Sequence, residues 1–263
     1  MISLVRRRFQ KSRPRILPVL PLRQTSSQSM NLINTDLANL RLSYTSGTLD
    51  EGAVAGTTPF TLFDAWLTAA KTTEREANAM TIATADANGR PSARIVLLKA
   101  FDERGFVFYT NYNSRKSEQL AQNPYASLTF YWGERQVRIE GSVVKVSDEE
   151  SDAYFATRPR GSQIGAWVSY DQSSAVASRA VLEEREKQVE EKFEGVEKVD
   201  RPPFWGGWRI QPTYVEFWQG REGRLHDRIV FQRSDEPAVA GSVVSSGKDR
   251  VRSCEWTTCR LMP

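Results

Sequence analysis

The stretch GRLHDRIVF, residues 223–231, contains His226, the only histidine in 263 residues. If this stretch is a β-strand, alternate residues share a face, so Arg224, His226 and Arg228 point the same way. Cationic groups on one face repel one another unless an anion lies between them, and histidine can relay protons near neutral pH. The pattern predicts an anion-binding face. Its alternative is a solvated strand edge with an incidental histidine.

Two further basic clusters accompany this stretch. Arg94 and Lys99 bound the apolar run IVLL, and Arg115 and Lys116 fall in the first turn of an expected helix. Acidic residues are usual there, because the helix dipole is positive at that end. Two cations beside free backbone N–H groups form a phosphate site. One phosphomonoester carries about −1.5 to −2 charges, so two clusters indicate two phosphates.

Aromatic residues lie close in sequence to the basic ones, namely Tyr109, Tyr154 and Trp218, and Arg158 ends another expected helix. Aromatic rings beside cations suit a flat heterocycle that carries a phosphate, and they also suit single-stranded nucleic acid. The structural alternatives are a barrel core for the rings and a favourable helix-dipole contact for Arg158. The residues alone leave these readings open.

The elements that must position these residues are mostly short strands. The Asn88-Gly89 turn predicts a hairpin, and apolar periodicity predicts an amphipathic helix over 59–71 that begins at Pro59 and buries Phe60, Phe63, Trp66, Leu67 and Ala70. Further helices are expected over 113–124, capped by Asn113 or Ser114, over 148–159 and over 178–193. Strands are expected over 80–86, 92–101, 106–111, 125–132, 135–147, 206–220 and 224–234.

No alternation of strands and helices and no Gly-rich nucleotide motif is present in the sequence. We therefore expect a mainly β fold, an antiparallel β-barrel with peripheral helices, in a single domain over residues 36–263. Residues 235–253 contain few large apolar groups and are expected to form a mobile loop. Cys254 and Cys259 have no nearby histidine to complete a zinc site and are expected to be ordinary thiols, so metal catalysis is not expected.

The net charge of +4 is unevenly distributed. Residues 1–35 hold seven basic residues and no acidic one, and removing these seven from 36 leaves 29 basic against 32 acidic residues, a net charge of −3. The arm over 1–35 predicts a mitochondrial transit peptide; the alternatives are an inert tail, with a cytoplasmic protein, or an arm that binds nucleic acid or anionic lipid. No apolar run approaches the roughly 20 residues of a membrane span. The acidic remainder argues against nucleic acid as partner.

A series of long motifs in order resembles the pyridoxine/pyridoxamine 5′-phosphate oxidase family. The resemblance runs from about Leu40 to Phe231, with a weaker match at RLMP near the end. Its motifs are EANAMTIATAD, GRPSARIVLLKAFDERGFVFYTNYNSRKSEQLAQNPYASLTFYW, RQVRIEG, TRPRGSQIGAWVS, QSS, EFWQG and RLHDRIVF.

The resemblance implies a split antiparallel β-barrel that works as a homodimer with FMN at the subunit interface. It implies oxidation of pyridoxine or pyridoxamine 5′-phosphate to pyridoxal 5′-phosphate, with hydride transfer from the substrate C4′ to flavin N5. O2 then accepts the electrons and leaves as hydrogen peroxide. Such an enzyme needs two phosphorylated heteroaromatic ligands, no metal, no nucleic acid and no membrane.

The resemblance also assigns roles to residues. Arg224 and His226 match the catalytic pair that grips the substrate ring, with His226 either orienting the substrate or relaying a proton. The substrate positions are Lys99, Tyr154, Arg158, Ser162, Arg224, Leu225 and His226, with Arg41 and Tyr44 in a segment that can cover the active site. The FMN positions are Arg94, Ile95, Val96, Leu97, Tyr109, Thr110, Arg115, Lys116, Gln136, Gln172, Ser173, Trp218 and Arg228.

Departures from the family pattern bear on three of these positions. Two residues, Tyr170 and Asp171, stand between VS and QSS where the family usually has one, which affects the register of Gln172 and Ser173. The segment after Tyr44 lacks most of the basic residues that often follow it. The alternatives to the oxidase are another split-barrel FMN oxidoreductase and a non-catalytic protein that binds FMN or pyridoxal phosphate.

Overall fold

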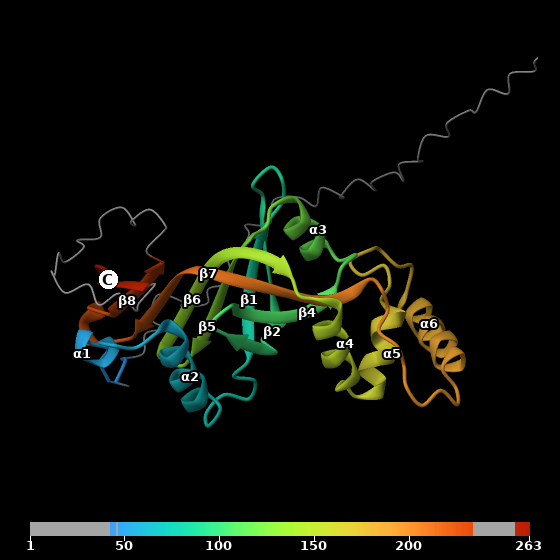
Figure 1. Ribbon diagram of the computed structural model, residues 1–263, viewed down its shortest axis with the longest axis horizontal. Coiled ribbons are helices and arrows are strands. Elements are labelled where there is room, and N and C mark those ends of the chain that lie inside the picture. The colour runs from blue at the N-terminus through green and yellow to red at the C-terminus, as the bar shows by residue number, and fades with distance from the viewer. Residues whose placement is uncertain (1–42, 46, 234–255) are drawn as a thin grey trace, which may run out of the picture. The chain divides into compact units, whose positions relative to one another are not determined.

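The computed structural model describes residues 43–45, 47–233 and 256–263 (Figure 1). These described residues form one compact unit. The expected basic arm over 1–35, the expected loop over 235–253, Arg41 and Cys254 lie outside the described residues. No helix in the described part of the chain is long and apolar enough to cross a membrane.

Nine antiparallel strands of the described chain form one sheet, in the order β2-β1-β5-β6-β7-β4-β3, with β8 paired to β7 and β9 paired to β8. The fold is a mainly antiparallel half-barrel with helices, as expected from the sequence. The strands are β1 Ala79–Ala85, β2 Pro91–Leu97, β3 Ala100–Asp102, β4 Gly105–Asn111, β5 Tyr125–Trp132, β6 Arg135–Lys145, β7 Trp205–Gln219, β8 Asp227–Arg233 and β9 Trp256–Arg260.

The long strand β7 connects the two halves of the sheet. One of its edges pairs with β6, while its other edge pairs first with β4 and then with β8. The register shifts at a bulge between Glu140 and Gly141, and a Cβ at Gly141 would lie 2.0 Å from the carbonyl oxygen of Gln211. Glycine therefore permits the close backbone approach at which β7 changes partner.

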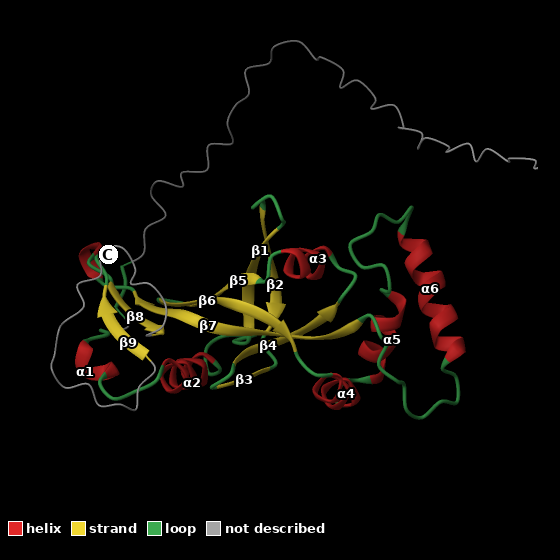
Figure 2. Cartoon of the chain, turned by 45° about the horizontal axis from the view of Figure 1, so that its top comes forward, coloured by secondary structure: helices red, strands yellow, loops and turns green. Residues whose placement is uncertain are grey.

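Six helices complete the described chain: α1 Glu51–Val54, α2 Pro59–Ala70, α3 Arg115–Gln122, α4 Asp148–Ala156, α5 Arg160–Val168 and α6 Arg179–Lys192. In α2 the expected apolar face is buried, and Phe63 lies 5.0 Å from Phe106 and 5.1 Å from Phe130 between ring centroids. Figure 2 shows α4, α5 and α6 gathered at one end of β7, with α1 and α2 toward its other end. The sheet therefore has two differently covered ends.

Three expectations from the sequence were incomplete or wrong. The short elements α1, α5 and β9 were not expected. The run over 92–101 is two strands, because the chain leaves β1 at Leu98, whose N–H donates to Asn78, and joins β4 at Lys99, whose N–H donates to Val107. β8 begins at Asp227 rather than at residue 224, and this changes the argument about His226.

Candidate functional site

A pocket of about 400 Å³ lies where β7 begins, between the sheet and the helices α4 and α5. It brings together the four side chains expected to hold a substrate phosphate: Lys99 follows β2, Tyr154 lies in α4, Arg158 lies in the turn between α4 and α5, and Ser162 lies in α5. Its lining also includes three positions expected to contact FMN. The lining residues are Val96, Leu97, Lys99, Tyr109, Tyr154, Thr157, Arg158, Pro159, Ser162 and Trp205.

Arg158 carries the clearest sign of a missing ligand. Its guanidinium carbon lies 4.5 Å from the ring centroid of Trp205 and 5.6 Å from that of Phe155. Burial lowers the pKa of Arg158 below its ordinary value, and its Nη1 is buried with no hydrogen-bond partner among the described residues. An unpaired buried donor costs about 1–3 kcal/mol, so an anion in this pocket would relieve that cost.

Stacked aromatic rings form one wall of the pocket. The ring of Tyr109 lies 4.0 Å from Tyr154 and 5.5 Å from Trp205 between centroids, with interplanar angles of 14° and 11°. Burial, assisted by the nearby charge of Glu150, raises the pKa of Tyr109 to about 12, which keeps the phenol neutral. Tyr109 and Tyr154 pack against a second, smaller core cluster and line the pocket, so the barrel-core alternative does not describe them.

A second group of cations lies at the start of α3. The Nζ of Lys116 donates to Thr110 Oγ1 at 2.9 Å, Ser114 Oγ at 3.2 Å and Gln172 Oε1 at 3.2 Å. Burial, followed by the charge of Arg94, lowers the pKa of Lys116 to about 8. A partly buried ammonium that has only neutral acceptors is held in a site that favours an added negative charge.

Arg94 and Arg115 extend this group. Arg94 donates to Thr84 Oγ1 at 2.6 Å, and its pKa is lowered by burial and then by the charge of Arg115. Among the described residues no acidic side chain forms an ion pair with either arginine or with Lys116. Ser114 occupies the N-cap position, but its hydroxyl donates to Asn111 O instead of capping α3. The helix start therefore keeps unpaired positive charge.

The loop that precedes α6 meets this group. The Oγ of Ser173 accepts from the Arg115 N–H at 3.2 Å, and Gln172 accepts from Lys116 as described. Ser173 adopts a positive φ of 79°, which is uncommon outside glycine. Despite the extra residue before QSS, both side chains reach the start of α3.

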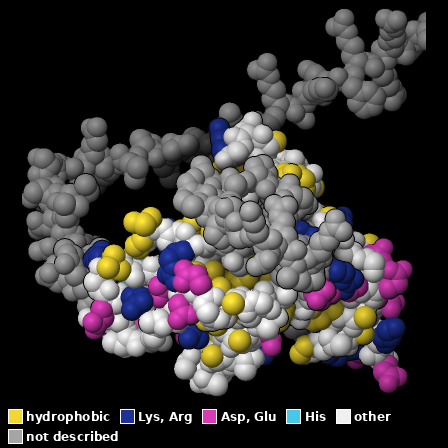
Figure 3. Space-filling view, turned by 60° about the vertical axis from the view of Figure 1, so that its left-hand side comes forward, with side chains coloured by type: hydrophobic (Ala, Val, Ile, Leu, Met, Phe, Trp, Pro, Cys, Tyr) yellow, Lys and Arg dark blue, Asp and Glu magenta, His cyan; other side chains and the backbone are white. Residues whose placement is uncertain are grey.

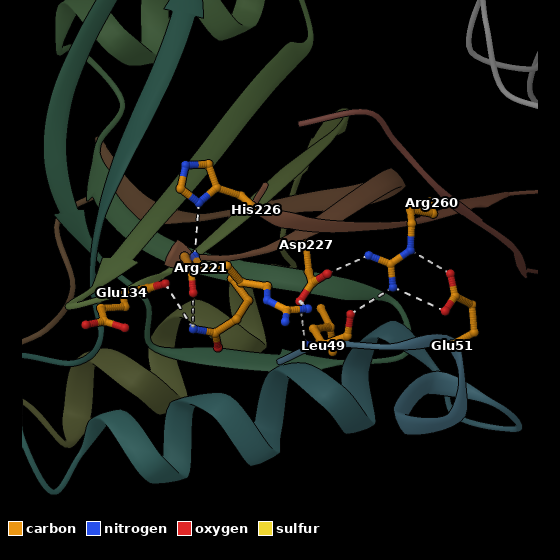
Figure 4. Close-up of polar contacts among 9 residues, drawn as sticks. Leu49, Glu51, Glu134, Arg221, His226, Asp227 and Arg260 are labelled. Atoms are coloured by element: carbon orange, nitrogen blue, oxygen red, sulfur yellow. Dashed lines mark hydrogen bonds and ion pairs between the residues drawn. The ribbon is translucent and has the colours of Figure 1, made fainter. Parts of the chain in front are cut away.

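His226 lies at the opposite end of β7, in the connection to β8. Its Nδ1 accepts a hydrogen bond from the Arg221 N–H at 3.0 Å (Figure 4), and its ring centroid lies 4.7 Å from Trp218 and 5.4 Å from Tyr44. With Nδ1 acting as acceptor, the neutral ring carries its proton on Nε2. The imidazole is thus held between two aromatic rings with an N–H donor available.

The prediction that Arg224, His226 and Arg228 share one strand face is wrong. Gly223 and Arg224 both have positive φ values, 66° and 63°, and residues 222–224 form a single 3-10 turn that closes the β7–β8 connection. Only Arg228 lies in β8, where its Nε donates to the buried carboxylate of Glu216 at 2.8 Å. The turn places Arg224 and His226 outside β8, and the positive charge of Arg228 is neutralised by Glu216.

The other expected residues of this end lie near His226. Gln136 stands opposite Trp218 in the β6–β7 register, and Tyr44 packs against both Trp218 and His226. Leu225 is 72% exposed, and Arg224 is exposed beside it. Ile95, at the edge of the sheet, is 65% exposed.

Sequence reasoning missed the residues that hold the turn in place. The buried carboxylate of Asp227, directly after His226, accepts from the Leu49 N–H at 2.9 Å and from Arg260 Nη1 at 2.7 Å. Arg260 also donates to Glu51 at 2.6 Å and to Leu49 O at 3.0 Å (Figure 4). The pKa of Asp227 is lowered by these hydrogen bonds against the effect of burial. In the sequence, the only indication of these contacts is that the acidic residue Asp227 directly follows His226.

The two expected parts of the substrate site lie far apart within one chain. Trp205 lines the pocket and Trp218 contacts His226, thirteen residues further along β7. At about 3.3 Å per residue, the strand between them is on the order of 40 Å long. Figure 1 shows β7 running between these two ends.

The described part of the face in Figure 3 carries Lys and Arg interspersed with Asp and Glu.

Comparison with protein families gives two matches. Residues 67–193 match the family described as pyridoxamine 5′-phosphate oxidase, and residues 205–263 match the pyridoxine 5′-phosphate oxidase C-terminal dimerisation region. A pyridoxine/pyridoxamine 5′-phosphate oxidase of Burkholderia vietnamiensis is 55% identical over 212 residues, which cover 80% of this chain and 97% of that relative. A protein of the same name from Burkholderia ambifaria is 52% identical over 232 residues, 87% of this chain and all of the relative.

Solved structures share the fold. PhzG from Burkholderia lata 383, in complex with tetrahydrophenazine-1-carboxylic acid, superposes with a TM-score of 0.71 at 28% identity, over 84% of this chain and all of that one. A pyridoxamine 5′-phosphate oxidase-related FMN binding protein of Nostoc punctiforme gives 0.58 at 16% identity, over 79% of this chain and 99% of that one. The second likeness concerns the fold alone.

Proposed function

The chain belongs to the pyridoxine/pyridoxamine 5′-phosphate oxidase family, and from this premise we propose how its residues divide the work of that enzyme. The reaction is the oxidation of pyridoxine or pyridoxamine 5′-phosphate to pyridoxal 5′-phosphate with O2 as acceptor. The family uses FMN. The single observation that best supports the division of residues is the buried, unpaired Nη1 of Arg158 in a pocket that also contains Lys99, Tyr154 and Ser162.

The residues fit both phosphorylated ligands. Arg115 and Lys116 at the start of α3, with Arg94 from β2, would hold the FMN phosphate, because this group carries positive charge that no acidic side chain of the described chain neutralises. Thr110, Gln172 and Ser173 lie beside them. The pocket residues Lys99, Tyr154, Arg158 and Ser162 would hold the substrate phosphate. Ile95, Val96, Leu97 and Tyr109 would contact the flavin from the same chain.

We propose that the remaining residues reach the site from a second copy of the chain. A homodimer is supported by the match of residues 205–263 to a dimerisation region. Because about 40 Å of β7 separates the pocket from His226 within one chain, a single small substrate cannot touch both. The end that presents Gln136, Trp218, Arg224, Leu225, His226 and Arg228 would therefore complete the partner's pocket. Tyr44, and Arg41 outside the described residues, would cover it.

Within such a site the chain orients the substrate. FMN, when bound, would supply the two-electron redox chemistry for which O2 is the final acceptor. Arg158 and Lys99 would anchor the substrate phosphate. Arg224 would bind the substrate ring and oppose negative charge that develops there. His226, with Nδ1 occupied by the Arg221 N–H, would donate a hydrogen bond from its Nε2–H to an acceptor on the substrate ring and so orient it.

The test of this proposal uses the purified protein. We expect a yellow protein that forms an aldehyde and hydrogen peroxide when pyridoxine 5′-phosphate and O2 are supplied. A yellow protein without turnover would favour a non-catalytic FMN-binding protein. A protein that takes up no FMN would exclude both the oxidase and every other split-barrel FMN oxidoreductase.

We further propose that the basic arm over residues 1–35, which lies outside the described residues, directs import into mitochondria. Its support is the run of basic residues without any acid. Microscopy of a fusion of the full chain to a fluorescent protein tests this. Import that persists after the arm's arginines are replaced by glutamine would contradict it.

A further inference from the structure

The loop over residues 169–174 brings Gln172 and Ser173 to the start of α3, and it is fixed on the side nearer β4. The Nδ2 of Asn111 donates to the Ser169 carbonyl, and the Nδ2 of Asn113 donates to the Tyr170 carbonyl at 2.8 Å. These bonds fix the backbone before Asp171. Two turn bonds, from the Gln172 N–H to Ser169 O at 3.1 Å and from the Ser174 N–H to Asp171 O at 3.0 Å, continue the loop through Ser173 with its positive φ. The Asp171 side chain is not fixed by any of these bonds.

The second anchor comes from α6. Arg185 Nη1 donates to Asp171 Oδ1 at 2.7 Å, and the Arg185 guanidinium lies 4.9 Å from the ring centroid of Tyr170. The side chains of Arg185 and Asp171 are only 24% and 30% exposed. Tyr170 and Asp171 are the two residues that stand where the family usually has one. Both residues of this longer connection therefore contact Arg185 in α6.

We propose that Arg185 is a positioning residue for the cofactor: through Asp171 and Tyr170 it holds the loop so that Gln172 and Ser173 meet the cations that bind the FMN phosphate. This inference rests on the proposed function of the α3 group. Among the described residues Arg185 forms no hydrogen bond with Arg115 or Lys116, so its effect would pass through the loop alone.

A matched control lies on the same helix. Arg179 also pairs with an acid, Glu183, at 3.1 Å, but this pair connects two residues of α6 and its side chains are 78% and 60% exposed. An exposed pair of this kind contributes little, and it contacts no part of the loop. Arg179→Ala therefore removes an arginine and an ion pair from α6 while leaving the loop untouched.

The experiment measures the dissociation constant of FMN for apoprotein, from quenching of flavin fluorescence, and repeats it with riboflavin, which lacks the phosphate. We expect Arg185→Ala and Asp171→Ala each to weaken FMN binding roughly three- to ten-fold, the range of one partly buried ion pair. The double variant should lose no more than Arg185→Ala alone, because that variant already removes the contact with Asp171 as well as the one with Tyr170. Riboflavin affinity and the KM of the FMN-loaded enzyme for pyridoxine 5′-phosphate should stay unchanged.

Arg185→Lys, which keeps the charge, should recover part of the FMN affinity, and Arg179→Ala should match the wild type. Equal losses for FMN and riboflavin, additive losses in the double variant, or no loss in Arg185→Ala would each overturn the inference. A wild-type protein that binds no FMN would instead refute the proposed function on which the inference rests.

Discussion

Arg158 is half-buried beside Trp205, and its buried Nη1 has no hydrogen-bond partner among the described residues, which makes it the most informative single residue. A charge-assisted hydrogen bond to a phosphate would satisfy it. We expect Arg158→Ala to lower kcat/KM for pyridoxine 5′-phosphate by about 100-fold, corresponding to roughly 2–3 kcal/mol. FMN affinity should be unchanged. Steady-state kinetics and FMN titration check this.

The matched control for Arg158 is Arg90→Ala, since Arg90 is an exposed arginine in the β1–β2 turn. It should leave both measurements at the wild-type level. A variant at Arg158 that loses FMN while keeping its KM for substrate would show that the pocket serves the flavin phosphate instead.

Lys116 predicts a pH dependence of cofactor binding. Its pKa in the apoprotein is lowered from 10.5 to about 8, because burial disfavours the charged form. A phosphate dianion binds the protonated amine, so FMN affinity should be level from pH 7 to 8 and fall above 8, toward about ten-fold per pH unit. Lys116→Arg keeps its charge in this range and should remove most of the fall.

The lowered pKa of Lys116 also makes the free energy of unfolding of the apoprotein depend on pH. Between pH 8 and 10.5 the unfolded chain holds the Lys116 proton more tightly than the folded apoprotein does. The contribution of this lysine to the free energy of unfolding therefore rises with pH across that window. FMN affinity that stays constant to pH 9.5 in the wild type would contradict the assignment of Lys116.

At the scale of elements, the β7–β8 turn is held by contacts from residues near the start and near the end of the described chain. Arg260 in β9 and the backbone of Leu49 both reach the buried Asp227 beside His226. We expect Arg260→Ala to lower the free energy of unfolding by about 1–2 kcal/mol, since the carboxylate loses a charged partner. It should also raise the KM for substrate, because Arg224 and His226 lose their support. Urea denaturation and kinetics measure the two effects.

The stability effect should depend on pH. The pKa of Asp227 lies below its ordinary value of 3.8, so its contribution to stability is present above that value and is lost as the pH falls through the lowered pKa. The control is Arg104→Ala, which removes a pair with Asp102 in which the arginine is 68% exposed. An Arg260→Ala variant no less stable than this control would refute the role given to the turn contacts.

Much of the element pattern could be read from the sequence, and the failures have physical causes. Apolar periodicity correctly placed α2 and its buried face, and the Asn88-Gly89 turn placed the first hairpin. Strand alternation failed at Arg224, because the left-handed conformations of Gly223 and Arg224 depend on how the hairpin closes. The short helix α5 and the strand β9 depend on tertiary packing, so their local sequence carried little signal.

The site was predictable for a different reason. The resemblance placed Lys99, Tyr154, Arg158 and Ser162 together, and one pocket contains all four. The support given by Trp205 and the contacts of Asp227 with Arg260 were not predicted, since they join residues far apart in the chain. Their roles in catalysis, like those of the other site residues, stay proposals.

At the scale of the whole molecule, two copies of the chain are required if one substrate is to meet both Arg158 and Arg224. The pocket lies at one end of β7 and the turn at the other. This claim separates a dimer that merely stabilises the fold from one that assembles the active site.

Mixing two inactive variants tests whether each active site is built from two chains. Arg158→Ala and Arg224→Ala, each inactive alone, are unfolded, mixed in equal amounts and refolded together with FMN. If each site takes its pocket from one chain and its turn from the other, half of the dimers are hybrids with one intact site, and activity should return to about one quarter of the wild type. If each chain builds its own site, every site carries a substitution, and the mixture would remain as inactive as its components.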